Sequence, residues 1–294
     1  MRVFVTGASG WVGSAVTRDL IAAGHSVLGL ARSEPSAAIV AAAGAEVHRG
    51  ALDDLDSLAR GAAACEAVIH TAFIHDFTAF AANCAIDRAA IEAIGAVLAG
   101  TGRPLIVTAG TLGLPRGRLG TEDDFVADGL PRKSEEAALS LVARGVRAMV
   151  VRLAPSVHGD GDHGFVPILI RTARERGFST YVGDGANRWP AVHRFDAARI
   201  YRLALEQGTA GARFHGVADP GIPVRAIAEA IGRRLGVPAV SKTPEEASAM
   251  LGFIGHALGM DAPTSSALTQ ERLGWRPTGP GLLADLEGGR YFDA

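Results

Sequence analysis

Three glycines close to the amino terminus, Gly7, Gly10 and Gly13, have the spacing of a turn that binds phosphate groups. They follow an apolar run and precede apolar residues at helical spacing, which predicts a strand, a turn and a helix. The first glycine permits a tight turn, the second lets the backbone approach a pyrophosphate, and the third lets the helix pack against the strand. The start of the helix offers free N–H groups and a partial positive charge to the anion. We therefore expect a dinucleotide site formed by Gly7, Ser9, Gly10, Trp11, Val12 and Gly13, the alternative being a glycine-rich turn without a ligand.

The residues that follow the second predicted strand, at positions 26–30, distinguish between NAD and NADP. A carboxylate there would accept hydrogen bonds from the ribose hydroxyls of NAD, whereas this chain has Ala31, Arg32 and Ser33. A guanidinium binds a 2′-phosphate through charge-assisted hydrogen bonds. Arg32 and Ser33 therefore predict NADP(H) as the cofactor, and the alternative is that Arg32 is a solvated surface charge.

Three further side chains could give a proton to a substrate. Hydride transfer to a carbonyl carbon leaves charge on the oxygen, which then needs a proton. Thr111 follows the fifth predicted strand, at 104–108, where its hydroxyl either polarises a carbonyl or caps the backbone. His158 and His163 lie in a polar loop after the sixth predicted strand, and histidine titrates near neutral pH. These three residues are the catalytic candidates, although the two histidines could instead shape the loop by hydrogen bonding.

Composition and charge argue against several other classes of protein. The net charge is −2, with 29 basic and 31 acidic residues, which predicts no binding to nucleic acid or to an anionic membrane. The two cysteines, Cys65 and Cys84, lack metal-ligand spacing and are expected to be reduced thiols, and the nine histidines contain no HExxH pattern, so no metal is predicted. The chain enters its first strand at once and has no apolar run of membrane-spanning length. A cytoplasmic protein with a small-molecule substrate is expected.

The elements that position these residues alternate between strand and helix. Strands are predicted at 3–6, 26–30, 45–48, 67–70, 104–108 and 146–153, with helices between them. This alternation predicts an α/β fold with a doubly wound parallel sheet, and strand exits then line the ligand crevice. Leu52 is expected to cover the adenine, and the other exit residues expected at the cofactor are Thr71, Ala72, Phe73 and Thr108.

The composition changes after residue 155. We expect residues 1–155 to form the dinucleotide-binding domain, with later segments returning to it, and residues 156–294 to form mainly a small α/β lobe that binds substrate. The predicted elements of this lobe are too dispersed in the sequence to form an independent core. Phe73, Phe165 and Trp189 are expected either to wall an apolar pocket or to belong to the core.

Over essentially its whole length the chain resembles the extended short-chain dehydrogenase/reductase family. The segment from Thr6 to Gly13 is similar to that family's TGxxGxxG motif, Asn83 to its asparagine in the fourth helix, and residues 189–196 to its "fvHvdD" segment. Residues 152–159 resemble the exit of its sixth strand, which implies that Pro155 and Val157 lie against the nicotinamide. The resemblance also implies a hydrogen-bonded structural pair, His193 with Asp196, and a homodimer through helices near 77–98 and 134–144.

The chain departs from this family at its proton donor. The family has a tyrosine followed four residues later by a lysine, but here the tyrosines are Tyr181, Tyr201 and Tyr291 and the lysines are Lys133 and Lys242. Alignment on Ser134 puts Pro131 at the tyrosine position and Glu135 at the lysine position, with Gly110 or Thr111 in place of the usual serine. The pattern therefore resembles an atypical subgroup that lacks the standard pair.

The sequence predicts an NADP(H)-dependent oxidoreductase that reduces a C=O group, or a C=N or C=C group, of a small organic molecule with a non-standard proton donor. One alternative is a regulatory protein similar to NmrA-like regulators, which binds the dinucleotide without chemistry. Another is a nucleotide-sugar epimerase or dehydratase, although Arg32 and Pro131 argue against it.

Overall fold

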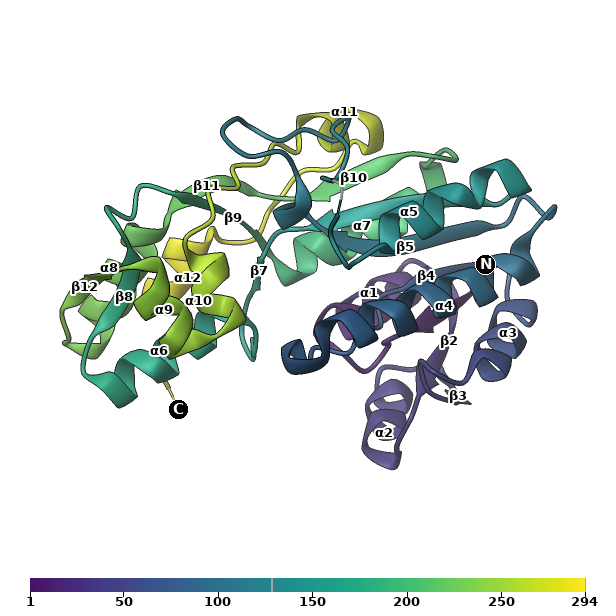
Figure 1. Ribbon diagram of the computed structural model, residues 1–294. Helices are drawn as coiled ribbons and strands as arrows, with labels where there is room; N and C mark the ends of the chain where they lie inside the picture. Colours follow the sequence, from purple (N-terminus) through teal and green to yellow (C-terminus); the bar gives the residue numbers. More distant parts are fainter. Residues whose placement is uncertain (128, 294) are drawn as a thin grey trace.

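Seven parallel strands form the main sheet of the computed structural model, which describes residues 1–127 and 129–293 (Figure 1). The strands lie in the order β10-β6-β5-β4-β1-β2-β3. Their bounds are Arg2–Thr6 for β1, Ser26–Ala31 for β2, Glu46–Arg49 for β3, Ala67–His70 for β4, Pro104–Gly110 for β5, Arg147–Leu153 for β6 and Arg213–Gly216 for β10. Strand β2 pairs with one edge of β1, and β4 pairs with the other edge. The strand order therefore reverses between β1 and β4, and a ligand crevice is expected where the carboxyl ends of these two strands meet.

Helices cover both faces of this sheet, as apolar strands with two buried faces require. One face packs against α1 (Trp11–Ala22), α2 (Glu34–Ala42), α7 (Arg194–Gln207) and the end of α11 (Ala267–Leu273). The other packs against α3 (Leu55–Ala63), α4 (Phe80–Leu98) and α5 (Ser134–Ser140). The predicted doubly wound α/β fold is confirmed.

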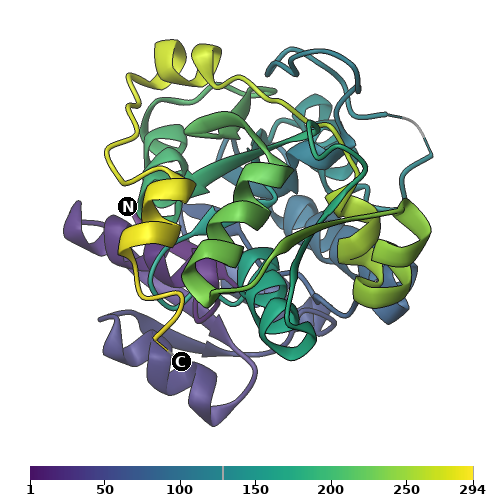
Figure 2. The ribbon, with the colours of Figure 1, turned by 90° about the vertical axis from the view of Figure 1, so that its left-hand side faces the viewer.

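A smaller lobe lies beyond the carboxyl edge of the sheet, and Figure 2 shows its helices in front of the main sheet. It contains the strand group β11-β9-β7 and the pair β12-β8. The strands run Ser156–His158 for β7, Ser179–Val182 for β8, Arg188–His193 for β9, Asp219–Pro223 for β11 and Ala239–Lys242 for β12. The helices are α6 (Phe165–Arg176), α8 (Val224–Leu235), α9 (Pro244–Leu251), α10 (Phe253–Leu258) and α12 (Leu282–Gly288).

The lobe has its own apolar core, contrary to the prediction from the sequence. Ile170 of α6, Trp189 of β9, Ile231 of α8, Leu258 of α10 and Leu286 of α12 pack into one buried cluster. Each helix supplies a short apolar face that the linear sequence separates by tens of residues, so the sequence pattern does not reveal their convergence. The lobe can therefore hold its shape while it presents side chains to the crevice.

The division near residue 155 remains a prediction, and two elements beyond it pack with the main sheet. Helix α7 covers one face, and β10 pairs with β6 from Arg213↔Val150 to Gly216↔Leu153. The polar segment after β6 was expected to be a loop, but part of it forms β7, which pairs with β9. In the described parts of the chain no helix has both the length and the apolar character needed to cross a membrane.

Candidate functional site

The glycine turn after β1 has the expected geometry. Gly7 has φ +70°, and a Cβ atom there would come within 2.8 Å of the Ala72 backbone nitrogen. A Cβ at Gly13 would come within 2.1 Å of the Gly7 carbonyl oxygen. The turn is closed by the Gly10 N–H, which donates to the Gly7 carbonyl at 2.8 Å. Gly7 and Gly13 are therefore required by the packing of the turn itself.

Gly10 is less confined by the rest of the protein than Gly7 and Gly13. It is exposed, its φ of −78° suits any residue, and the nearest atom to an added Cβ would be the Gly7 carbonyl oxygen at 3.1 Å. It caps α1, whose first turn carries no acidic side chain and whose cap has no side-chain hydrogen bond. The free N–H groups of this helix start, next to an open glycine, fit the pyrophosphate of a dinucleotide.

Trp11 joins this helix start to the lobe. Its indole Nε1 donates to the Val157 carbonyl at 2.7 Å, and the Arg194 guanidinium stacks over its ring at 4.0 Å. Arg194 also donates to the Ser14 hydroxyl at 2.7 Å. His163 is exposed, with its ring centroid 5.7 Å from that of Trp11. The sequence did not predict Arg194 at this site, because its position follows from the packing of α7 against α1.

The exit of β2 presents Arg32 to solvent. Ser33 caps α2, its hydroxyl accepting the Ser36 N–H at 3.4 Å. Leu52 is 9% exposed and belongs to the apolar cluster under α3, so only its edge can reach a ligand. Arg32 therefore has room to bind a phosphate, while Ser33 and Leu52 also have structural tasks.

A buried polar chain lies at the meeting point of β1 and β4, and the sequence analysis missed it. The Thr6 hydroxyl lies 2.9 Å from His70 Nδ1, and His70 Nε2 lies 3.1 Å from the Asp87 carboxylate of α4. The Thr71 hydroxyl donates to the Thr6 carbonyl at 2.7 Å, which fixes the two strand exits against each other. The His70 imidazole therefore bridges the Thr6 hydroxyl at the end of β1 and the Asp87 carboxylate of α4.

Asp87 connects this chain to the start of α5. The Ser134 hydroxyl donates to its carboxylate at 2.5 Å, and the Arg132 Nε donates to the Ser134 hydroxyl at 3.0 Å. Burial acts to raise the pKa of Asp87, but hydrogen bonds from His70 and Ser134 and the charge of Arg132 hold that pKa below its usual value. Asp87 is therefore a buried carboxylate whose charge favours a guanidinium close to it.

Arg132 lies beside the strand exits. Its Nη2 donates to the Thr108 carbonyl at 3.1 Å, and its guanidinium stacks over the Phe73 ring at 4.3 Å. The Thr108 hydroxyl donates to the His70 carbonyl at 2.9 Å and lies 2.8 Å from the hydroxyl of Tyr201. Thr108 was predicted to bind cofactor, and its hydroxyl makes these contacts within the protein.

Thr111 begins the short 3-10 helix η2 (Thr111–Gly113) directly after β5. The residue is 1% exposed, and within the described residues its hydroxyl has no hydrogen-bond partner. A buried hydroxyl without a partner is costly, so its presence at a strand exit is consistent with a ligand that accepts or donates there. The hydroxyl does not cap the described backbone, which was the alternative for Thr111.

His158 differs from its sequence-based description. It lies in β7 rather than in a loop, it is fully buried, and its Nδ1 lies 2.8 Å from the Asp285 carboxylate of α12. Its ring also contacts that of His193, with centroids 5.5 Å apart. Its Nε2, like the Thr111 hydroxyl, is buried without a hydrogen-bond partner among the described residues, so burial does not separate these two candidates.

The predicted hydrogen-bonded pair of His193 and Asp196 does not form. Asp196 instead accepts hydrogen bonds from the backbone N–H groups of Thr278 at 3.0 Å and Gly279 at 2.8 Å, and it pairs with Arg199. The carboxylate at the start of α7 therefore holds the segment after Trp275, which carries the chain back to the lobe.

The two positions aligned with the family's tyrosine and lysine do not form a proton-donating pair. Pro131 is exposed and has no titratable group. Glu135 is buried and accepts hydrogen bonds from Arg152 at 2.6 and 2.7 Å and from Arg213 at 2.8 Å. Glu135 therefore links α5 to β6 and β10.

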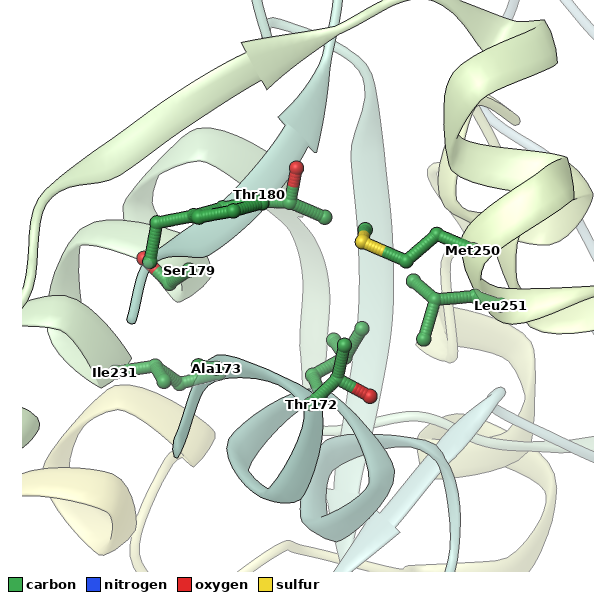
Figure 3. A pocket seen from close by; sticks show the side chains of 9 residues that line it. Thr172, Ala173, Ser179, Thr180, Ile231, Met250 and Leu251 are labelled. Atoms are coloured by element: carbon green, nitrogen blue, oxygen red, sulfur yellow. The ribbon is translucent and has the colours of Figure 1, made fainter. Parts of the chain in front are cut away.

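A metal site finds no support in the described residues, and one cavity of the lobe is too small for a substrate. Among those residues, no group of three or more His, Cys, Asp or Glu side chains is arranged to hold a metal ion. A cavity in the lobe, lined by Thr172, Thr180, Ile231, Met250 and Leu251 among others, encloses about 10 Å³ (Figure 3). That is the space of about one water molecule, too small for an organic substrate.

Known proteins similar to this chain include both sequence relatives and solved structures. The model of the NAD dependent epimerase/dehydratase family matches residues 3–92. The chain is 52% identical over 295 residues to uncharacterized protein C2A9.02 of Schizosaccharomyces pombe, covering 99% of this chain and 100% of the relative. It is 28% identical over 279 residues to 4-hydroxy-2-methyl-3-oxo-4-farnesyl-3,4-dihydroquinoline-1-oxide ketoreductase of Stigmatella aurantiaca, covering 88% and 80%. The fold is similar to that of DesIV, a dTDP-glucose 4,6-dehydratase from Streptomyces venezuelae solved with NAD and TYD bound, with a TM-score of 0.80, 21% identity and coverage of 100% and 97%.

Proposed function

Because the chain belongs to the NAD dependent epimerase/dehydratase family, that is, the extended short-chain dehydrogenases/reductases, we propose that it is an NADP(H)-dependent reductase. Its substrate is a small organic molecule with a C=O group. The ketoreductase relative supports a carbonyl as the reacting group. The alternatives of a C=N or C=C group share the same hydride chemistry and differ in the atom that takes the proton.

The observation that carries this proposal is the unpartnered hydroxyl of Thr111 at the exit of β5. A bound dinucleotide would supply a hydride for the carbonyl carbon of the substrate, whose oxygen would then carry developing negative charge. The Thr111 hydroxyl donates a hydrogen bond to that oxygen and so favours the charge that develops on it. The final proton comes from solvent or from His163, which is exposed beside Trp11.

The preference for NADP(H) rests on Arg32. Its exposed guanidinium follows β2 directly and is free to bind a 2′-phosphate, and neither Ala31 nor Ser33 offers a carboxylate to the ribose hydroxyls of NAD. Arg32→Ala is expected to raise the Kd for NADPH about tenfold and to leave the Kd for NADH unchanged. Fluorescence titration measures both, with the exposed Arg60→Ala as the matched control. Equal weakening of both dinucleotides would contradict the phosphate assignment.

The experiment that tests the whole proposal combines binding with turnover. Purified protein is titrated with NADPH and NADH and is then incubated with a panel of ketones, imines and enones while NADPH absorbance is followed. NADPH binding with turnover of a panel member supports a reductase. Tight binding without any turnover would favour the alternative, a non-catalytic NADP-sensing protein similar to NmrA-like regulators.

A homodimer through α4 and α5 is part of the proposal. These two helices pack side by side on one face of the sheet, where Arg88 and Glu92 of α4 form an exposed ion pair. Sedimentation velocity is expected to give the mass of two chains, and a monomer at micromolar concentration would exclude this dimer.

A further inference from the structure

Five phenylalanines form an aromatic seam between the main domain and the lobe. They are Phe73, Phe77, Phe80, Phe165 and Phe253, out of 11 in the chain. Phe77 and Phe253 stack face to face, with ring centroids 4.6 Å apart and an interplanar angle of 5°. Phe80 and Phe165 lie 5.7 and 6.4 Å from Phe253, and Phe73 lies 6.1 Å from Phe80. The seam thus continues from one domain into the other.

The seam lies at the ligand-binding edge of the fold. Phe73 follows β4, and Phe77 and Phe80 occupy the 3-10 turn η1 (Phe77–Ala79) and the start of α4. Phe165 and Phe253 are the first residues of α6 and α10, the lobe helices on the facing side. All five are partly exposed, whereas the core residues Trp189 and Phe4 are fully buried. The seam therefore offers aromatic surface that a ligand can reach.

A fixed positive charge marks one end of the seam. The Arg132 guanidinium stacks on Phe73 and is oriented by the Thr108 carbonyl and by Ser134, which in turn is bonded to the buried Asp87 carboxylate. Stacking on an aromatic face combined with hydrogen bonds of fixed direction preorganises the guanidinium. An oxygen that carries negative charge would be stabilised there.

Resting on the reductase function proposed above, we propose that the aromatic seam and Arg132 together recognise a planar, conjugated carbonyl substrate with an anionic or enolic oxygen near Arg132. Phe77 and Phe253 already stack on each other, so a flat ring lies against the partly exposed rings of the seam and gains aromatic contacts there. A substrate rich in hydroxyl groups would leave those groups without partners against the phenylalanine rings.

The test measures binding of 2-naphthoate by calorimetry to the full-length protein with NADP⁺ present. Two comparison compounds separate the effect of the ligand's charge from that of its planarity. Decahydro-2-naphthoate keeps the charge but is not planar, and 2-naphthylmethanol is planar but uncharged. The naphthoate is expected to bind at least about tenfold more tightly than either. Equal affinity for naphthoate and decahydronaphthoate would overturn the proposal without any variant being needed.

Substitutions test which residues recognise the negative charge of the ligand and which recognise its planar ring. Arg132→Gln is expected to weaken naphthoate about tenfold and to leave naphthylmethanol unchanged, and Phe253→Leu is expected to weaken both planar compounds. The matched controls are Arg116→Gln, an exposed arginine, and Phe125→Leu, which is 72% exposed and lies over Arg213. Loss of binding in the controls, or none in Arg132→Gln, would contradict the assignment.

Turnover distinguishes this inference from the proposed function. Binding of naphthoate without reduction of any ketone supports the recognition site and contradicts the reductase. Reduction of ketones with KM values that Arg132→Gln and Phe253→Leu leave unchanged supports the reductase and overturns the recognition site.

Discussion

Gly10 differs from the two other glycines of its motif in what surrounds it. Gly7 and Gly13 are confined by the protein's own backbone, whereas Gly10 is exposed and an added Cβ there would meet only the Gly7 carbonyl oxygen, at 3.1 Å. A side chain at position 10 therefore disturbs a bound pyrophosphate more than it disturbs the fold.

Gly10→Val is expected to raise the Kd for NADPH by about tenfold or more, because the side chain fills the space that the pyrophosphate needs. Fluorescence titration gives the affinity, and circular dichroism shows whether the protein is folded. Gly288→Val, where an added Cβ meets no atom within 4 Å, is the matched control. A folded Gly10→Val protein with unchanged affinity would mean that the turn does not bind the cofactor.

Thr111 can be tested by removing only its hydroxyl. Thr111→Val is expected to lower kcat by about 100-fold while the Kd for NADPH stays constant, since one donor to a developing oxyanion contributes on this scale. His163→Phe is expected to have this effect if that histidine supplies the proton. Steady-state kinetics with a reducible ketone separates the two, and an unchanged kcat in Thr111→Val would remove Thr111 from the mechanism.

The role of a residue could be predicted from the sequence where neighbouring positions in the chain determine its conformation. The glycine turn follows from backbone sterics within a few positions, so its strand, turn and helix could be predicted. The chain from Asp87 through Ser134 to Arg132 could not, because its members come from α4 and from the segment around the start of α5. No periodicity in the sequence marks that contact.

At the scale of elements, Glu135 ties α5 to the far edge of the sheet. Its carboxylate accepts hydrogen bonds from Arg152 of β6 and Arg213 of β10. Burial acts to raise the pKa of Glu135, but the two guanidinium groups outweigh it and hold that pKa below its ordinary value of 4.5. A depressed pKa in the folded state means that this contribution to stability is present above pH 4.5 and is lost as the pH falls through the folded pKa.

Glu135→Gln is therefore expected to reduce the free energy of unfolding at pH 7 by about 3 kcal/mol, because the buried guanidinium of Arg152 and the partly exposed one of Arg213 lose their anion. The difference from the wild type is expected to narrow as the pH falls below 4.5. Urea unfolding at several pH values measures it. A difference that stays constant down to pH 3 would show that the charge of Glu135 does not contribute.

Most strands and helices of the main sheet were predictable, since their apolar runs and helical spacing are continuous in sequence. The strands and helices of the lobe were harder to predict from the sequence. Strand β7 spans three residues in a polar segment and exists because β9 pairs with it, and the lobe core draws on short helices spread over more than a hundred residues. Pairing partners distant in sequence decide these elements.

At the scale of the whole molecule, binding of the proposed cofactor is expected to stabilise the fold. A dinucleotide that binds the native strand exits but not the unfolded chain stabilises the protein by about 2.7 kcal/mol at a concentration of 100 times its Kd. NADPH is expected to raise Tm by about 5 °C in the wild type and to have little effect in Gly10→Val. Differential scanning calorimetry measures both. An equal increase in the two proteins would place the stabilising contact elsewhere.

The contact between α1 and α7 has a consequence for how the protein is made. The ends of these helices, Ala22 and Gln207, are 185 residues apart, and Trp275 completes the same apolar cluster. On a translating ribosome, α1 therefore emerges without the helix that covers it, and α7 follows roughly 10 to 40 s later. During that interval the apolar face of α1 stays uncovered, so the glycine turn at its amino end, the proposed dinucleotide site, gains its final packing late in synthesis.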